Sequence, residues 1–217
     1  MGRGMCKNLV EKGQLEKPLI IFNRTTKRAE ELSSALPSGK STVSSSIADL
    51  VAKSDIIFTC VGDDAAINET IDAALKDGPS GKLFVDCSTV HPDTTTALEK
   101  KVVAAGSEFV ACPVFGAPAM ADSGMLVCVL AGPKESVEKV KPYTKGVIGR
   151  ANIDFVDLAR KDARHAMALA EAAGTRLKDV EVADAHLAQV KEHKGAAGDI
   201  AAIYGAVRKE AGLKFEN

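Results

Sequence analysis

The sequence lacks the features that would direct it to a membrane or to nucleic acid. No apolar run approaches the ~20 residues that a membrane span requires, and the N-terminus has no apolar core of the kind found in signal peptides. The 28 basic and 29 acidic residues nearly cancel, leaving a net charge of −1. Neither nucleic acid nor an anionic membrane is therefore expected as a partner. We expect a cytoplasmic protein, and a mitochondrial location stays open in case a presequence has been lost.

Several kinds of catalytic and structural site are also missing. The five cysteines are scattered, odd in number and include no Cys-x-x-Cys pair, which is typical of a reduced intracellular protein. His186 and His193 lie seven residues apart with no third ligand in view, so no metal site is predicted. The chain has no Gly-x-Ser-x-Gly elbow, and Gly39-Lys40-Ser41 lacks the upstream glycine of a phosphate loop.

What the chain does contain is an alternation of short apolar runs with helical patterns up to about residue 111. This alternation is typical of βαβ units and a parallel sheet. Strands are predicted at residues 18–22, 55–59 and 82–86, with helices at 26–36, 64–75 and 92–105, and another short strand within 41–46. Further on, strands are predicted at 125–130 and 151–155, with a helix at 133–141 between them. Residues 156–217 show only helical patterns.

The end of the first predicted strand carries a candidate binding motif, Phe22-Asn23-Arg24-Thr25. In a dinucleotide-binding fold the corresponding strand end faces the adenosine ribose, where an acid would accept from the 2′-hydroxyl of NAD. A guanidinium there suits a 2′-phosphate instead, because it matches phosphate oxygens in a bidentate manner. The alternative is a solvated basic cluster at a helix start, although cations there oppose the helix dipole.

Four segments together resemble one known family. They are Met1 to Gly13, Phe22 to Lys27, Asp86-Cys87-Ser88-Thr89 and Cys112-Pro113-Val114-Phe115-Gly116. In order and spacing they resemble the β-hydroxyacid dehydrogenases, which include 6-phosphogluconate dehydrogenase and the 3-hydroxyisobutyrate, tartronate semialdehyde and glyoxylate reductases. The pair Lys161-Asp162 is similar to a Lys-Asp pair in the C-terminal domain of that family.

The resemblance implies a set of site residues. Those near the cofactor would be Gly2 at the pyrophosphate turn, Arg24 and Thr25 at the 2′-phosphate, and Asn23, which would shape the turn that carries them. Val61 would follow the strand that ends over the cofactor, Thr89 would lie near the nicotinamide ribose, and Lys161 would lie near the cofactor. Those near the substrate would be Phe115, Gly116, Ala117 and Asp162. Phe115 stands where the family usually has a serine that donates to a substrate carboxylate, which puts the substrate class in doubt.

Two parts of the family pattern are absent. The first strand and the first two glycines of the Gly-x-Gly-x-x-Gly pyrophosphate turn are not in this sequence, so the strands on either side should lack their central partner. No Gly-x-x-Gly followed by Lys-x-x-x-Asn occurs near residue 155, so the general acid/base lysine of the family is missing. No catalytic residue is therefore assigned.

The expected fold class is α/β, a Rossmann-type doubly wound parallel sheet with its first strand missing, followed by a short all-α remnant. The boundary is expected at residue 155, with an NADP-binding domain at 1–155 and a helical remnant at 156–217. The expected function is hydride transfer between NADP(H), rather than NAD(H), and a small hydroxy or aldehyde acid, impaired in this chain. A non-catalytic NADP-binding or interaction protein and a nonfunctional partial gene product stay as alternatives, and a homo-oligomer is left open.

Overall fold

The structure, a computed structural model, describes residues 1–152, 156–195 and 202–216, and the side chains of 151–162 and 165 fall outside this description. The chain forms two compact units, Met1–Asn152 and Ile153–Asn217. They are described separately below.

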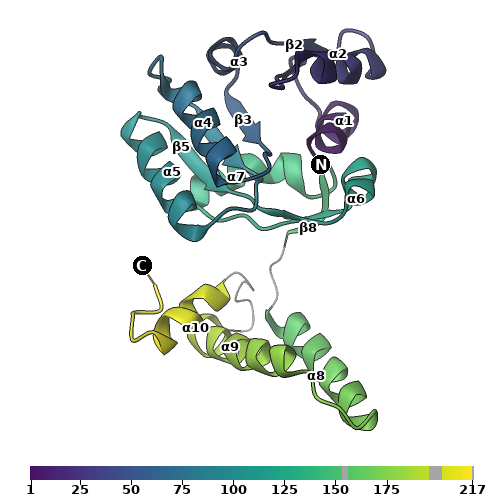
Figure 1. Cartoon of the computed structure of the whole chain (residues 1–217), viewed down its shortest axis with the longest axis vertical. Coiled ribbons are helices and arrows are strands. Elements are labelled where there is room, and N and C mark those ends of the chain that lie inside the picture. The colour runs from purple at the N-terminus through teal and green to yellow at the C-terminus, as the bar shows by residue number, and fades with distance from the viewer. Residues whose placement is uncertain (153–155, 196–201, 217) are drawn as a thin grey trace. The chain divides into compact units, whose positions relative to one another are not determined.

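The first unit is built from alternating helices and parallel strands (Figure 1). Its parallel strands are β1 (Leu19–Ile21), β2 (Ser41–Val43), β3 (Ile56–Thr59), β4 (Leu83–Asp86) and β5 (Glu108–Ala111). The helices among them are α1 (Gly2–Lys12), α2 (Thr26–Ala35), α3 (Ile47–Lys53), α4 (Asp64–Leu75) and α5 (Pro92–Ala104). The expected α/β fold class is thereby confirmed, and each predicted strand up to residue 111 forms within its expected range.

Local signals set the starts of these helices. The Ser46 side chain accepts from the backbone N–H of Asp49 at 3.1 Å and caps α3. Asp63 accepts from the N–H of Ala66 at 2.8 Å and caps α4, and Pro92 occupies the first turn of α5, where it removes no intrahelical hydrogen bond. The N-terminal pattern that resembles a helix interior is indeed helical, as α1.

The rest of the first unit is a smaller mixed sheet. Its elements are β6 (Val114–Phe115), α6 (Pro118–Ser123), β7 (Leu126–Cys128), α7 (Lys134–Thr144) and β8 (Gly149–Asn152). β6 is antiparallel and β8 parallel to β7. The last strand begins two residues earlier than predicted, and the remainder of the predicted range, 153–155, lies outside the described residues. The sequence patterns did not predict α3, β5, β6 and α6. Helices as short as α3 and α6 make fewer than two full turns, and strands as short as β5 and β6 are too short to establish an alternation.

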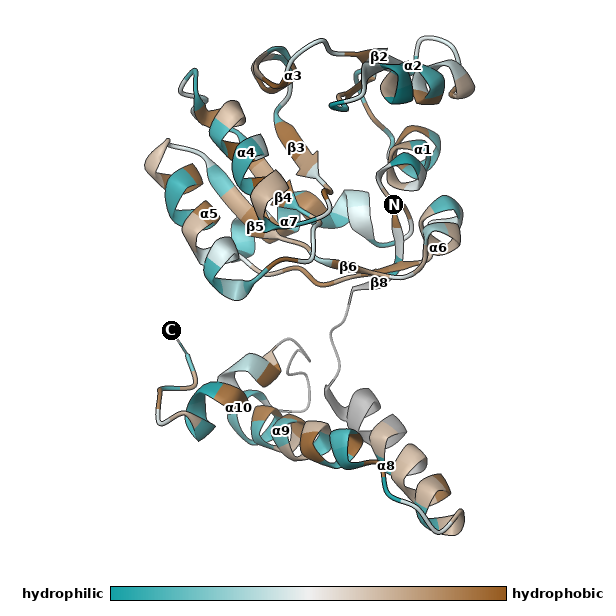
Figure 2. Cartoon of the chain, in the orientation of Figure 1, coloured by the Kyte–Doolittle hydropathy of each residue, from teal (hydrophilic) through white to brown (hydrophobic). Residues whose placement is uncertain are grey.

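The parallel strands do not form one continuous sheet. Among the described residues, β1 pairs only with β2. β3 pairs only with β4, and β4 pairs in turn with β5. This agrees with the expectation that these two strands lack a common central partner. The apolar strands β3 and β4 stand out in the hydropathy colouring (Figure 2), and Ile57 and Phe84 are buried between α3, α4 and α5.

The second unit contains helices in its described part. They are α8 (Val156–Ala172), α9 (Lys178–Lys194) and α10 (Ile203–Glu210). Leu187 and Val190 of α9, Ala206 of α10 and Phe215 form a small core. His186 is buried and its Nε2 lies 2.8 Å from a carboxylate oxygen of Glu210. Over the described ranges, no helix is long and apolar enough to cross a membrane.

Candidate functional site

Two neighbouring cavities open where β1 and β3 end. We call the first the α1 cavity; it has a volume of about 280 Å³ and its lining includes Gly2, Arg3, Cys6, Asn23, Arg28 and Cys60. We call the second the α4 cavity; it has a volume of about 370 Å³ and its lining includes Asn23, Arg24, Thr25, Arg28, Val61 and Glu69. Asn23 and Arg28 belong to both linings, so the two cavities adjoin. Their position at the carboxyl ends of parallel strands is the place where open α/β sheets bind ligands.

The turn after β1 is held by its own side chains. The backbone N–H of Thr25 donates to Oδ1 of Asn23 at 2.9 Å, and the N–H of Arg28 donates to the carbonyl of Thr25 at 2.9 Å. An asparagine that bonds to the backbone two residues on is a local turn device. Asn23 therefore shapes the segment that presents Arg24, which is the role the family resemblance implies for it.

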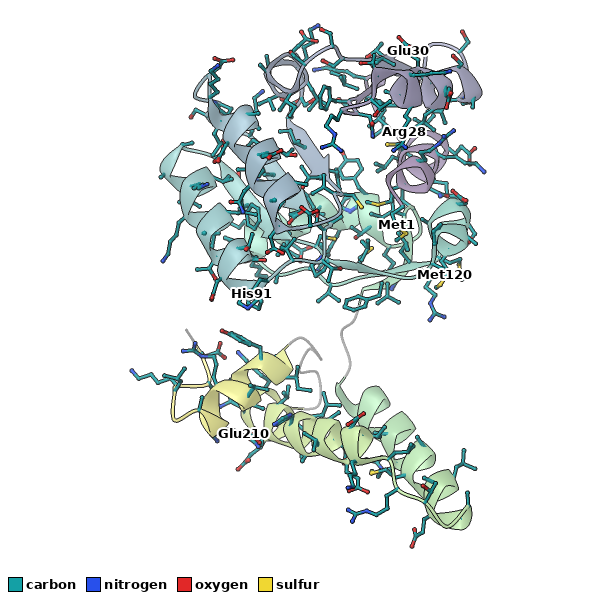
Figure 3. All side chains as sticks on the ribbon, viewed as in Figure 1. Met1, Arg28, Glu30, His91, Met120 and Glu210 are labelled. Carbon is teal, nitrogen blue, oxygen red and sulfur yellow. The ribbon has the colours of Figure 1, made fainter. Side chains whose placement is uncertain are left out.

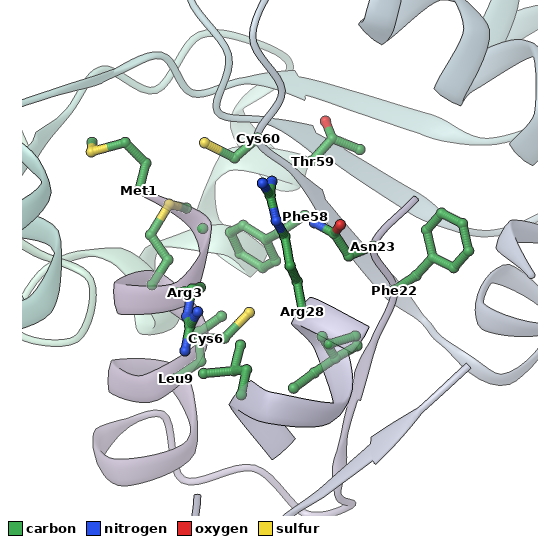
Figure 4. A pocket seen from close by; sticks show the side chains of 15 residues that line it. Met1, Arg3, Cys6, Leu9, Phe22, Asn23, Arg28, Phe58, Thr59 and Cys60 are labelled. Carbon is green, nitrogen blue, oxygen red and sulfur yellow. The ribbon is translucent and has the colours of Figure 1, made fainter. Parts of the chain in front are cut away.

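Arg28 is a residue that the sequence analysis did not place in the site. It lies four residues after Arg24, within the first turn of α2, and reaches both cavities. In the close-up its guanidinium points into the cavity between Cys60 and Asn23 (Figure 4), and Figure 3 labels it between α2 and α1. The available signal was the basic pair Lys27-Arg28 in the first turn of α2, close in sequence to Arg24.

The α1 cavity is cationic. Arg3 and Arg28 line it, and no Asp or Glu does; Arg3 is 3.8 Å from Glu31, with both side chains largely exposed. Burial raises the pKa of the Cys6 thiol to about 11, and burial likewise raises the pKa of the Cys60 thiol. Both thiols are thus neutral near pH 7, and the cavity carries positive charge without a thiolate to offset it.

The first turn of α1 adds donors to the same cavity. No side chain caps this helix, and no acidic residue lies in its first turn. A Cβ placed on Gly2 would meet nothing within 4 Å, so the backbone is open to an approaching ligand there. Uncapped N–H groups at the start of an 11-residue helix, next to two guanidinium groups, are suited to an anion.

A buried polar network holds the loops that follow β3 and β4. The Thr59 hydroxyl donates to Oδ1 of Asp86 at 3.0 Å, and the backbone N–H of Ser88 donates to the same oxygen at 3.0 Å. The Ser88 hydroxyl accepts from the N–H of Val61 at 3.0 Å. Asp86 is 3% exposed, so it accepts both hydrogen bonds in the protein interior. The Asp86-Cys87-Ser88-Thr89 segment therefore positions Val61 at the edge of the α4 cavity.

The remaining residues predicted for the site lie apart from these cavities. Thr89 is exposed on the loop after β4, and Phe115, Gly116 and Ala117 lie at the end of β6 and the start of α6; none of them lines either cavity. Phe115 is 56% exposed. Lys161 and Asp162 lie within α8, but their side chains are outside the described part of the chain. The structure thus brings together Gly2, Asn23, Arg24, Thr25 and Val61, and adds Arg28. Within the same described ranges, no group of three His, Cys, Asp or Glu side chains could hold a metal.

The sequence and fold were compared with known proteins. Residues 1–153 match the model of the NAD binding domain of 6-phosphogluconate dehydrogenase. NADH-dependent oxidoreductase ucdB of Aspergillus ustus is 32% identical over 282 residues, covering 99% of this chain and 98% of that protein. Cytokine-like nuclear factor N-PAC of Danio rerio is 32% identical over 141 residues, which are 64% of this chain but only 29% of that protein.

A solved structure with the same fold is 3-hydroxyisobutyrate dehydrogenase of Mycobacterium tuberculosis with L-serine. It superposes with a TM-score of 0.63 at 18% identity, covering 90% of this chain and 68% of that one. The family match spans both cavities and all the parallel strands described above. The chain therefore belongs to the family defined by the NAD binding domain of 6-phosphogluconate dehydrogenase, and it is an NAD(P)-binding oxidoreductase of the hydroxyacid dehydrogenase class.

Proposed function

We propose that the chain binds NADP, with the 2′-phosphate of the adenosine half at Arg24, Thr25 and Arg28. The observation that carries this proposal is the convergence of Arg24 and Arg28 on one cavity, with Asn23 rather than an acid two residues after the end of β1. An acid at this strand end would accept from a ribose hydroxyl and repel a phosphate. The lining does hold one acid, Glu69, which comes from α4.

The α1 cavity would hold the pyrophosphate. The open backbone at Gly2, the uncapped first turn of α1 and the Arg28 guanidinium supply donors and positive charge at one place. Apolar side chains from α3, Ile47 and Leu50, line the α4 cavity and offer a surface for the adenine. When bound, the dinucleotide would supply or accept a hydride.

The relative from Aspergillus ustus is named as NADH-dependent, so the preference for NADP is the part that needs a direct test. Isothermal titration with NADP and NAD separately measures it, with the Arg24→Ala variant alongside. A charge-assisted hydrogen bond contributes about 1.5–3 kcal/mol. Arg24→Ala should therefore weaken the binding of NADP by about ten- to a hundredfold and leave the affinity for NAD nearly unchanged. Lys27→Ala is the matched control, because Lys27 is also exposed at the start of α2 but lines neither cavity.

Equal affinities for the two cofactors would contradict the assignment of the 2′-phosphate. A preference for NADP that survives Arg24→Ala but is lost in Arg28→Ala would assign the contact with the 2′-phosphate to Arg28 instead of Arg24. An equal loss in Lys27→Ala would mean that only the overall positive charge of the helix start matters.

For catalysis, we propose that the substrate class is a small hydroxy or aldehyde acid and that this chain turns it over poorly. The aligned stretch with the Aspergillus ustus relative is 282 residues long, whereas this chain has 217. At least 65 aligned positions therefore hold no residue of this chain. This gap supports the sequence expectation that the segment with the family lysine is missing.

A non-catalytic NADP-binding protein is the second candidate, and the same gap favours it. General acid/base groups contribute about 10²- to 10⁴-fold. Steady-state assays with NADPH and a panel of small aldehyde acids should show rates far below the ~1–10³ s⁻¹ of ordinary enzymes. A rate within that range would refute the loss of activity, and binding without turnover would support the second candidate.

A further inference from the structure

The polar groups that line the α4 cavity differ in kind according to the element they come from. The segment from the turn after β1 to the start of α2 contributes Arg24 and Arg28, which are cationic and only donate hydrogen bonds. Helix α4 contributes Glu69, the one acid in this lining, and an ionised carboxylate only accepts. Among the described residues, the Glu69 side chain forms no ion pair or hydrogen bond with these arginines or with any other group. Phosphate binding by the arginines therefore leaves this carboxylate without a role.

Packing fixes which face of α4 lines the cavity. Ile67 and Ile71 are 0% and 1% exposed and anchor the helix in the core. Ala66, Glu69 and Thr70, at spacings of three and four, line the cavity from a neighbouring face of the helix. The Thr70 hydroxyl donates to the carbonyl of Ala66 at 2.7 Å, so its proton is already used within α4. This side of the cavity therefore presents hydrogen-bond acceptors to a ligand.

An adenine base matches these acceptors through its amino group. The 6-amino group of adenine donates hydrogen bonds, whereas ring nitrogens such as N3 and N7 accept them. Ile47 and Leu50 of α3 provide apolar side chains for the flat faces of the base. With the 2′-phosphate held by Arg24 and Arg28, the base is the part of the adenosine half that remains to contact α3 and α4. Its 6-amino group then supplies the donor that Glu69 lacks.

We propose that Glu69 determines which base the cofactor carries: its carboxylate accepts a hydrogen bond from the 6-amino group of adenine and disfavours a purine with oxygen at that position. This proposal rests on the proposed binding of a dinucleotide in the α4 cavity. A 6-oxo purine would direct an acceptor at the carboxylate, so the two oxygens would repel each other and stay unpaired.

The size of the effect follows from the exposure of Glu69. Loss of a hydrogen bond to a charged group lowers affinity by about ten- to a hundredfold. Glu69 is exposed, and solvent weakens interactions of exposed charges, so the expected preference for adenine is at the lower end, about tenfold.

The test compares NADP with deamino-NADP, in which hypoxanthine replaces adenine. Both ligands carry the same phosphate groups, so the ratio of their affinities reports on the base and cancels any repulsion between Glu69 and the 2′-phosphate. Calorimetric titration of the full chain should give a ratio of about ten in favour of NADP. In Glu69→Gln the ratio should fall close to one, because an amide donates to a 6-oxygen as well as accepting from a 6-amino group. Glu99→Gln, which removes an exposed carboxylate of α5 that lines neither cavity, should keep the ratio of the unaltered chain.

The outcomes distinguish this proposal from the proposed function. Equal affinities of the unaltered chain for the two ligands would overturn the recognition of the base and leave the binding of NADP intact. A ratio that persists in Glu69→Gln, or that falls equally in Glu99→Gln, would also overturn it, since the carboxylate of Glu69 would then not distinguish the bases. An equal loss of affinity for both ligands in Glu69→Gln would assign this carboxylate to a ribose hydroxyl instead. Failure of the unaltered chain to bind NADP or NAD would refute the proposed function, and this proposal with it.

Discussion

The packing of α1 against α6 gives the sharpest stability prediction, at Gly4. A Cβ on Gly4 would lie 2.6 Å from the carbonyl carbon of Ala121, the nitrogen of Asp122 and a carboxylate oxygen of Asp122. Ordinary contacts between carbon atoms are about 3.5–4.0 Å, so Gly4→Ala would force the two helices apart by roughly an ångström. Two of the three atoms belong to the backbone, so no side-chain rotation can relieve the clash.

The separation also strains a buried hydrogen-bonded side chain. Nδ2 of Asn8, which is 1% exposed, donates to the carbonyl of Gly4 at 2.9 Å and across the helix contact to the carbonyl of Ala121 at 2.8 Å. Overpacking costs about 1–3 kcal/mol, and weakening a hydrogen bond costs about 0.5–1.5 kcal/mol. Alanine returns up to about 1 kcal/mol of helix propensity. The net expectation is a loss of about 1–3 kcal/mol in the free energy of unfolding.

Gly2→Ala is the matched control, since it makes the same change in the same helix. A Cβ there meets nothing within 4 Å, so the change in stability should stay within about 0.5 kcal/mol. Thermal unfolding followed by circular dichroism compares the two, and for a unit of this size 1 kcal/mol shifts the midpoint by about 2–4 °C. Gly4→Ala should therefore melt several degrees below Gly2→Ala. A Gly4→Ala protein that melts at or above Gly2→Ala would refute the argument that this glycine sets the distance between α1 and α6.

Three further predictions follow from named contacts. Asp86→Ala leaves two buried donors without their acceptor, so denaturant unfolding should show a loss of about 2–4 kcal/mol; an unchanged midpoint would mean that water replaces the carboxylate. Lys139 lowers the pKa of Glu108 below 4.5, so the stability from this pair is present above that pH and lost as the pH falls through the folded-state pKa. Glu108→Gln should accordingly flatten the acid limb of a stability–pH curve, and an unaltered limb would rule this pair out as its source. Phe115→Ser changes a side chain that is 56% exposed, so the melting temperature should stay nearly constant, whereas a large drop would show that the ring is part of the core.

Much of the fold and part of the site could be predicted because they depend on neighbours in the chain. The apolar runs and caps predict α4 at its observed bounds, and the spacing of motifs identifies the family. The Asn23-Arg24-Thr25 turn is a local structure, and the structure does place it at a cavity. Short elements such as β5 and β6 were missed, because a few apolar residues do not define a period.

The tertiary structure decided which of the predicted residues share a cavity and which do not. Arg28 enters the site only because α2 turns its first-turn face toward α1, and Gly4 matters only because α6, more than a hundred residues later, lies against it. The open edges of β1 and β3 are likewise a property of strand pairing. The sequence by itself determined the class of fold and the turn that carries Arg24, since both arise from local periodicity and local hydrogen bonds. Only the tertiary structure decided the cationic cavity, because contacts between distant segments depend on how helices and strands pack.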